Sequence, residues 1–479
     1  MTRSNREGRE LASLFSGVDW VTVLLYLLIA SIGCLSILSS SYNPESSDIF
    51  SFSHFYIKQA LWFGASIIIA IFILLTDTSS YHKYAYVLYG IGVILLVATL
   101  LFGREINGAK AWLDLGGFRL QSAELIKIFA ALAMARIMSA YSFDINRFSD
   151  IGRVAVLLFI PLAIIVLQND TGSGFVLGSF IFVLYREGLN QWLSLVIIAV
   201  AALSISSLLI SPLVLLILAL LLCVVSDMLI NQRWKWNLIY LSTVTLLTLL
   251  LFFAVKVFTG SEISMFNSLL YTSLASLPVV IVYAYRERLS STFILMFMYL
   301  ISVVMLPTIN YIFTSILQDY QRNRILSFLG VISDPLGADY NVNQSKIAIG
   351  SGGLLGKGFL EGTQIRYGFV PERHTDFIFC SIGEEWGFVG ATVLLALFCA
   401  LILRLMWMGE RHEEAFGRIY CYSVASILLF HLIVNVGMTL GLFPVMGIPL
   451  PFVSYGGSSL VAFTVMLFIA IKLSTVNNK

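Results

Sequence analysis

Residues 20–40, WVTVLLYLLIASIGCLSILSS, are predominantly apolar and carry no charged side chain, which indicates the fold class. A helix needs about 20 such residues to cross the hydrocarbon core of a bilayer. About fourteen comparable segments follow one another along the chain, with predicted bounds 20–40, 56–75, 84–102, 125–140, 154–167, 172–185, 192–209, 212–229, 237–257, 268–285, 293–313, 377–404, 419–442 and 458–473. The sequence therefore predicts an all-α polytopic integral membrane protein.

Composition supports the same class. Of 479 residues, 58% are hydrophobic and 12% are charged, whereas soluble domains carry about 25% charged residues. The formal net charge of +2 is too small for a surface that attracts polyanions. We therefore exclude an ordinary soluble enzyme, a disordered chain and nucleic-acid binding.

The distribution of Lys and Arg predicts the orientation. The short hairpins at 42–54, 210–211 and 259–264 hold neither residue, whereas the alternate connections hold most of them. Positively charged loops stay in the cytoplasm. We therefore expect both termini in the cytoplasm and two polar stretches, 104–123 and 315–375, outside. The second stretch is far longer than an ordinary connection and glycine-rich, which favours a functional loop whose backbone approaches a ligand.

Ionisable residues inside the spans are candidates for function, because burying charge in a membrane is costly. Glu124 and Lys127 stand three apart and share a helix face, either as a self-neutralising pair at a helix end or as part of a site. Asp170 lies in a polar joint between two spans, where it is compatible with a helix N-cap, a cavity residue or both. Glu384 and Glu385 are too hydrophobically surrounded to be simple surface charges.

Asp376 opens the span that follows the long loop, and the residues alone leave two roles open. An Asp at a helix start is a common cap, and a carboxylate beside Arg373 at the membrane face is a candidate general base. His374 is expected to be a structural hydrogen-bonding residue. Arg322 and Arg324, at the loop start, are either contacts for an anionic lipid head group or interface anchors.

Four motifs together resemble the SEDS family of cell-wall glycosyltransferases. They lie at 111–127, 168–172, 333–385 and 447–459, in the family's order and span context. Within the family, Gly447-Ile-Pro-Leu-Pro451 favours the elongation type, because division-type members usually have Thr in place of Pro449.

The resemblance implies a ten-span helical core, a long extracytoplasmic loop and, in this chain, about four extra spans within 212–313 whose role it does not explain. The predicted parts are a cytoplasmic tail (1–19), the first part of the core (20–190), a hydrophobic segment with the extra spans (191–313), the large extracytoplasmic loop (314–376) and the last part of the core (377–479).

The resemblance also implies a reaction. Such an enzyme polymerises lipid II into glycan strands at the outer face of the bacterial cytoplasmic (inner) membrane, by inverting transfer with release of undecaprenyl diphosphate, and serves cell elongation and shape. Asp376 matches the family's catalytic Asp. The residues expected to bind or surround the substrate are Trp112, Glu124, Lys127, Asp170, Arg322, Arg324 and Arg373.

Trp112 has an alternative role as an interfacial anchor. No metal-binding cluster is encoded, although a divalent cation, Mg²⁺ or Mn²⁺, is compatible with the lipid diphosphate. The implied protein partner is a class B penicillin-binding protein, a transpeptidase.

Two other functions fit many spans around a polar centre, namely a lipid II flippase and a non-catalytic scaffold of the elongation complex. A glycosyltransferase needs an acid–base residue at the outer face, whereas a flippase does not. The role of Asp376 therefore discriminates between these hypotheses.

Overall fold

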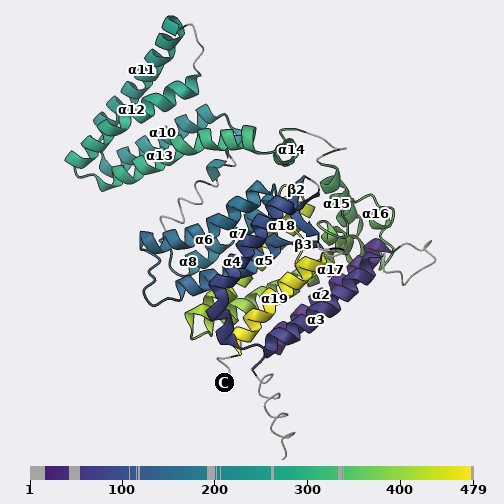
Figure 1. The fold of residues 1–479 in the computed structure, drawn as a ribbon. Coiled ribbons are helices and arrows are strands. Elements are labelled where there is room, and N and C mark those ends of the chain that lie inside the picture. The colour runs from purple at the N-terminus through teal and green to yellow at the C-terminus, as the bar shows by residue number, and fades with distance from the viewer. Residues whose placement is uncertain are drawn as a thin grey trace, which may run out of the picture. The chain divides into compact units, whose positions relative to one another are not determined.

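The computed structural model describes residues 17–42, 54–106, 108–114, 116, 119–190, 200, 202–204, 206–259, 264–332, 337 and 339–475. It divides into two compact units: unit 1, residues 1–189 with 334–479, and unit 2, residues 190–333. Figure 1 shows that both are helical. Most of the predicted tail 1–19, much of the predicted span 192–209 and part of the motif that begins at 333 lie outside the described residues.

Among the described residues, eleven helices are long and apolar enough to cross a membrane. They are α2 (Trp20–Ser41), α3 (Phe55–Leu75), α4 (Thr78–Phe102), α6 (Phe148–Leu167), α10 (Pro212–Asn231), α11 (Trp234–Thr259), α12 (Met265–Arg286), α13 (Ser290–Tyr311), α17 (Ile378–Glu410), α18 (Ala415–Thr439) and α19 (Gly457–Ser474). The all-α polytopic class is confirmed, and the chain is a multi-pass membrane protein.

Two further predicted spans are shorter helices. The span predicted at 125–140 corresponds to α5 (Ser122–Met138), which has only 17 residues. The span predicted at 172–185 is divided between α7 (Thr171–Leu177) and α8 (Phe180–Arg186). Both lie beside the site described below, where polar residues interrupt the apolar pattern.

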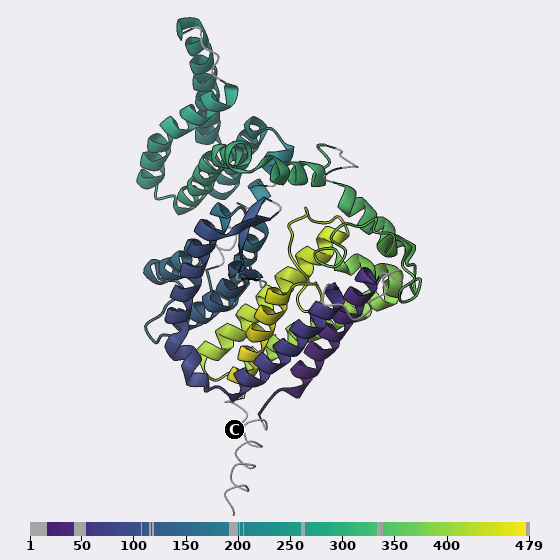
Figure 2. The same ribbon diagram turned by 45° about the vertical axis from the view of Figure 1, so that its right-hand side comes forward.

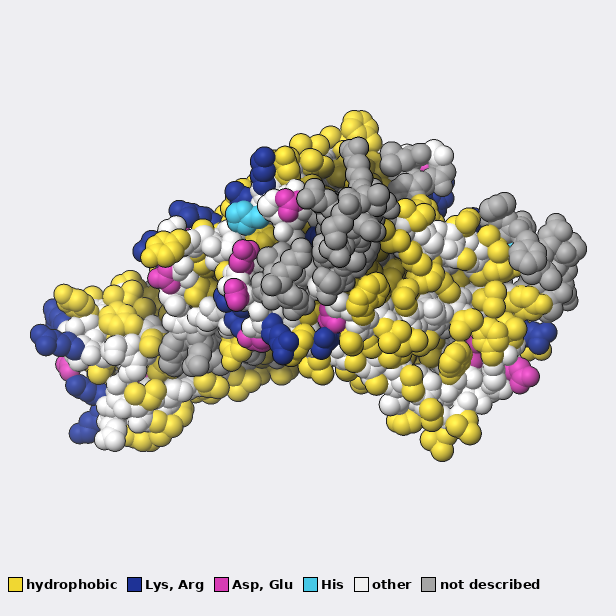
Figure 3. Space-filling model, turned by 90° about the horizontal axis from the view of Figure 1, so that it is seen from below, with side chains coloured by type: hydrophobic (Ala, Val, Ile, Leu, Met, Phe, Trp, Pro, Cys, Tyr) yellow, Lys and Arg dark blue, Asp and Glu magenta, His cyan; other side chains and the backbone are white. Residues whose placement is uncertain are grey.

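The centre of unit 1 is formed by α18 and α19. Their most apolar stretches are 78% and 83% buried, against 28% for α3. They pack on α5, α17 and α3, and Figure 2 shows α19 in yellow running through the middle of the unit. Figure 3 shows hydrophobic side chains over much of the surface in view, as expected where helices face lipid.

The polar stretch 104–123 folds into a small antiparallel sheet. Its strands are β1 (Arg104–Ile106), β2 (Ala109–Asp114) and β3 (Arg119–Gln121), in the order β1-β2-β3. Trp112 faces Arg104 on one side and Gln121 on the other. The sheet thus leads directly into α5, which begins at Ser122.

Unit 2 contains most of the extra spans as α10 to α13, followed by a π-helical turn η1 (Ile312–Ile316) and α14 (Asp319–Phe328). Among the described residues of unit 2, Asp227 is the buried carboxylate, and it accepts hydrogen bonds from Asn237 Nδ2 at 2.7 Å and Thr292 Oγ1 at 2.6 Å. Because these donors satisfy the carboxylate, Asp227 is a structural residue that fixes the packing of three helices.

Helix α17 is broken. Gly387 has φ 65° and ψ −162°, so the helical path is interrupted there, and only glycine adopts this conformation readily. The stretch 353–358, after α15 (Tyr340–Ser351), supplies the missing hydrogen-bond partners. Phe388 N donates to the carbonyl of Gly353 at 2.9 Å, and Gly358 N donates to that of Glu385 at 3.0 Å. The glycines expected to approach a ligand thus approach α17 itself.

Glu384 holds the next part of the loop. Its buried carboxylate accepts hydrogen bonds from Lys357 Nζ at 2.7 Å and from the backbone N–H groups of Gln364 at 2.9 Å and Ile365 at 3.0 Å. The last two residues lie in α16 (Thr363–Arg366). One buried anion therefore anchors the loop that leads to residue 376.

Candidate functional site

Asp376 lies two residues before α17 in a tightly held segment. The backbone carbonyls of residues 374 to 376 accept hydrogen bonds from Tyr455 N, Ser454 Oγ and Asn435 Nδ2, each at 2.8 Å. Its side chain is partly exposed. The N-cap residue of α17 is Phe377, so the cap position predicted as one alternative is not that of Asp376.

The neighbour of the Asp376 carboxylate is the loop between α18 and α19. A Cβ atom on Gly447 would lie 3.6 Å from Asp376 Oδ2, and Gly447 has φ +68°. The glycine lets the backbone pass beside the carboxylate in the left-handed conformation. The motif 447–459 therefore forms one wall beside the candidate base.

Asn435, on α18, joins this wall to Asp376. Its Nδ2 donates to the carbonyl oxygen of Asp376 at 2.8 Å and to that of Ile448 at 2.7 Å. The side chain is fully buried, so both hydrogen bonds form away from water, where leaving either acceptor unpaired would be costly. Asn435 was not predicted from the sequence.

A buried charged network supports the same loop. Lys127 Nζ lies 2.8 Å from Glu124 Oε1 and 3.1 Å from His431 Nε2, and these three residues are at most 1% exposed. His431 Nδ1 lies 3.0 Å from the carbonyl oxygen of Pro449. Because Lys has only donors, Nε2 accepts and Nδ1–H donates to Pro449, so the imidazole is neutral.

This network confirms the proximity of Glu124 and Lys127 and adds His431, which was not predicted. Lys127 is enclosed and already bonded to two side chains, so in this arrangement it does not contact a substrate directly. Burying an ion pair is costly. Here the pair Glu124–Lys127, through His431, holds the loop between α18 and α19 in one position.

Asp170 caps α7, and the first turn of this helix packs on the loop between α18 and α19. Its Oδ1 accepts a hydrogen bond from Ser173 N at 3.2 Å and so caps α7, and its Oδ2 accepts one from Gln121 Nε2 at 3.1 Å. The cap alternative is thereby confirmed. The next turn packs so closely that a Cβ atom on Gly172 would lie 2.1 Å from the carbonyl oxygen of Met446.

Arg373 and His374 are fixed against α2 and α3. Arg373 Nε donates to the carbonyl oxygen of Ser40, near the C-terminus of α2, at 2.8 Å, and burial lowers the pKa of Arg373. The ring of His374 stacks on Phe55 at 4.5 Å, and burial likewise lowers the pKa of His374. The prediction of a structural role for His374 agrees with this packing.

The remaining predicted residues lie elsewhere. Trp112 is half-buried on β2. Arg322 and Arg324 belong to α14 of unit 2, where Arg322 pairs with Asp319 at 2.7 Å and Arg324 lies over the ring of Tyr320 at 5.5 Å. Within the described part of the chain, no group of three or more His, Cys, Asp or Glu residues is arranged to hold a metal ion.

The family is decided by comparison with known proteins. The model of the FtsW, RodA and SpoVE family, described as cell cycle protein, matches residues 19–219 and 213–479. The chain belongs to this family. Similar family members include the peptidoglycan glycosyltransferase RodA of Treponema pallidum, 30% identical over 93% of this chain and 94% of that protein. The peptidoglycan glycosyltransferase MrdB of Escherichia coli K12 is 33% identical over 82% of this chain and 79% of its own length.

Solved structures of the family agree in fold. A chain of a peptidoglycan synthase complex has a TM-score of 0.58 and 26% identity, with 96% of this chain and 99% of that chain covered. RodA of Thermus thermophilus has a TM-score of 0.55 and 23% identity, with 96% and 98% covered. The family assigned from the four motifs is thus confirmed, and the relatives with RodA-type names fit the elongation type.

Proposed function

We propose that this chain is a peptidoglycan glycosyltransferase that polymerises lipid II into glycan strands, with Asp376 as the general base. Support comes from its membership of a family whose similar members carry that activity in their names. Asp376 is assigned as the base because its backbone is held by hydrogen bonds while its carboxylate is partly exposed beside Gly447.

The reaction needs one proton acceptor. The 4-hydroxyl of the acceptor GlcNAc attacks the anomeric carbon of the donor MurNAc, its proton passes to the Asp376 carboxylate, and the bond to undecaprenyl diphosphate breaks. A single displacement inverts the α-linked donor to a β linkage. Because diphosphate is a good leaving group, a second carboxylic acid is dispensable, unlike in glycoside hydrolysis.

The other predicted residues divide into three groups. Glu124 and Lys127 support the loop beside Asp376 through His431, and Asp170 caps the helix that packs on this loop. Arg373 of unit 1 is a proposed contact of the leaving diphosphate, and Trp112 is a proposed stacking surface for a sugar. Arg322 and Arg324 of unit 2 are proposed contacts of an anionic lipid head group. A divalent ion, Mg²⁺ or Mn²⁺, is proposed to arrive with the lipid diphosphate, whose oxygens are ligands that such ions accept.

The cellular setting follows from the same proposal. Lipid II is polymerised outside the membrane, so the end of unit 1 that carries Asp376 would face away from the cytoplasm. Both termini would lie in the cytoplasm. The proposed partner is a class B penicillin-binding protein of the elongation complex, and the similarity to a chain of a peptidoglycan synthase complex supports it.

The test uses the purified full chain with labelled lipid II, alone and with its cognate transpeptidase, and resolves the products on a gel. Long strands from the wild type and none from Asp376→Ala would support the proposal, provided that both proteins melt at similar temperatures. Strands from the variant would refute the base. No strands from either, with lipid II crossing liposome bilayers, would favour a flippase.

A further inference from the structure

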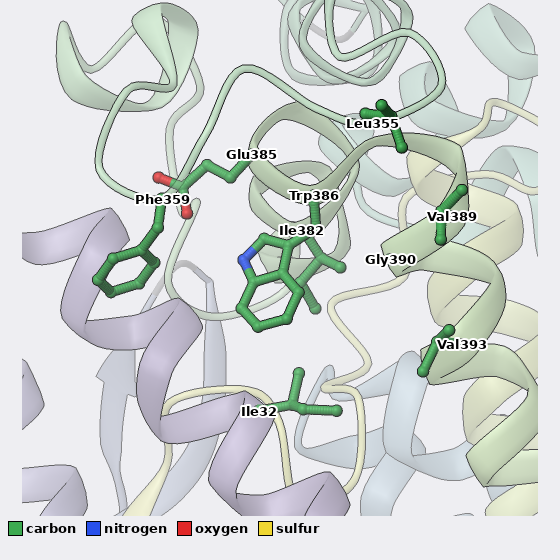
Figure 4. A pocket seen from close by; sticks show the side chains of 9 residues that line it. All are labelled: Ile32, Leu355, Phe359, Ile382, Glu385, Trp386, Val389, Gly390 and Val393. Atoms are coloured by element: carbon green, nitrogen blue, oxygen red, sulfur yellow. The ribbon is translucent and has the colours of Figure 1, made fainter.

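The exposed face of α17 runs along most of the helix. It begins at a groove of about 450 Å³ beside Ile32 of α2, and Figure 4 shows Val389 and Val393 of α17 at the edge of this groove. From there exposed residues recur at the spacing of one helix face, at 396, 399, 400, 403, 406, 407, 410 and 411. All except Glu410 and Arg411 are apolar. A face of this kind meets lipid chains along its length and lipid head groups at its charged end.

Two arginines flank Trp407 at the charged end of this face. Arg404 precedes Trp407 by three residues and Arg411 follows it by four, so the helix places them one turn before and one turn after the ring. Their guanidinium carbons lie 3.9 and 3.8 Å from the ring centre, which is the contact distance of flat stacking. The indole is therefore held between two guanidinium groups, one on each of its faces.

This stacking separates two groups that bind phosphate. The N–H groups of a guanidinium lie in its own plane and fit two oxygens of one phosphate. Here the two planes are parallel, lie on opposite sides of the indole and are separated by about twice the ring-to-guanidinium distance. A phosphate bound in one plane is thus beyond hydrogen-bond reach of the other guanidinium. The cluster offers two phosphate sites at a fixed separation.

Asp19, the N-cap residue of α2, fixes one of the two guanidinium groups. Arg404 Nε lies 2.7 Å from Asp19 Oδ2, and Arg404 Nη2 lies 3.0 Å from Asp19 Oδ1, so the Nη1 group takes no part in this pair. The Arg404 side chain is 29% exposed, and Trp407 and Arg411 are also exposed. Glu410, the acid beside Arg411, is paired with Arg186 at 2.7 Å. The cluster is therefore both ordered and accessible.

We propose that this cluster binds diphosphatidylglycerol, a lipid whose two phosphates are joined through a glycerol bridge. One phosphate meets Arg404 and the other meets Arg411, on either side of Trp407, while acyl chains lie along the apolar face of α17. Basic side chains at the membrane surface recognise such head groups. Phosphatidylglycerol has one phosphate and fills one site. The phosphates of a polyprenyl diphosphate share one oxygen, so they are too close together to span the indole.

The site lies at the opposite end of α17 from Asp376, because this helix begins two residues after Asp376 and ends at Glu410. The proposal therefore goes beyond the proposed function and does not depend on it. Through the pair of Asp19 with Arg404, the bound lipid would also secure the start of α2 against the end of α17.

The experiment measures lipid binding by native mass spectrometry of the purified full chain. Diphosphatidylglycerol, phosphatidylglycerol and phosphatidylethanolamine with the same acyl chains are titrated separately. We expect diphosphatidylglycerol to bind about tenfold more tightly than phosphatidylglycerol, because it makes two charge-assisted contacts in place of one. Equal affinity for these two lipids would overturn the proposal, and so would displacement of diphosphatidylglycerol by undecaprenyl diphosphate at a lower concentration.

Variants separate the geometry of the cluster from its charge. Trp407→Leu keeps both cations and an apolar side chain but removes the spacer, so it should abolish the preference for diphosphatidylglycerol. Arg411→Gln removes one phosphate site and should do the same. Arg286→Gln, which removes an exposed arginine at the end of α12, is the matched control and should retain the preference. A wild-type preference in Trp407→Leu, or an equal loss in Arg286→Gln, would show that charge alone selects the lipid.

Discussion

The side-chain nitrogen of Asn435 lies 2.8 Å from the backbone carbonyl oxygen of Asp376, and the same nitrogen donates a hydrogen bond to the backbone carbonyl oxygen of Ile448. The candidate base is thus positioned through its main chain by a buried residue of another helix. A catalytic group held in this way needs no reorganisation before the reaction.

Asn435→Ala is expected to lower kcat by about 30-fold, since the loss of two hydrogen bonds of about 1 kcal/mol each misplaces Asp376. KM for lipid II should change much less, because Asn435 is buried and does not reach the substrate. Polymerisation kinetics check the prediction, with Asn310→Ala on the exposed side of α13 as control. A wild-type kcat in Asn435→Ala would exclude this positioning role.

Gly172→Ala is expected to reduce polymerisation strongly. Its Cβ atom would lie 2.1 Å from the carbonyl oxygen of Met446, so the backbone beside Gly447 must shift. Gly152→Ala is the matched control, because nothing lies within 4 Å of its Cβ position on α6. That control should gain up to about 1 kcal/mol of helix stability. Equal activity of the two variants would contradict the close packing of α7 on this loop.

Lys127→Met is expected to destabilise the protein by about 3 kcal/mol, because it leaves the Glu124 carboxylate buried without its cation. The double variant Glu124→Gln/Lys127→Met removes both charges and should recover much of that loss. Unfolding of the four proteins of this cycle in mixed micelles measures the coupling. A double variant as unstable as the single one would argue against pairing as the source of the effect.

Stability should fall in mild acid. Burial lowers the pKa of His374 below its ordinary value of 6.5, so the unfolded chain binds a proton more readily than the folded one. The contribution is complete above about pH 6.5 and decreases as the pH falls toward the folded pKa. His374→Phe keeps the ring packing on Phe55 and should flatten the dependence of melting temperature on pH between about 7 and 5.

Part of that slope should remain in His374→Phe. Burial also lowers the pKa of His412, which contributes with the same sign. A slope identical to that of the wild type would show that His374 does not titrate in this range.

The sequence predicts what local pattern encodes. The apolar stretches indicate the membrane helices, the spacing of Glu124 and Lys127 places them on one face, and the polar joint at Asp170 allows a cap as one of two compatible roles. The structure has the helices, the pair and the cap. The motifs indicate the family, which matches along the chain.

Other features depend on contacts between distant segments. His431 and Asn435 are four residues apart on α18, and this pair of polar residues in an apolar helix was the signal available. Lys127, a partner of His431, is 304 residues away in the chain, and Asp376, a partner of Asn435, is 59 residues away. No local pattern reveals these pairs. The same holds for the break at Gly387, which requires the loop at 353–358 to complete the hydrogen bonds.

This break has a consequence for biosynthesis. The segment 353–358 is made before α17, so its carbonyl and N–H groups already exist when Gly387 leaves the ribosome. Helix α17 can therefore take its broken form during insertion without waiting for later spans. A deletion that shortens the segment would leave those backbone groups unsatisfied in the bilayer, which is costly, so the inserted helix would be less stable from the moment it forms.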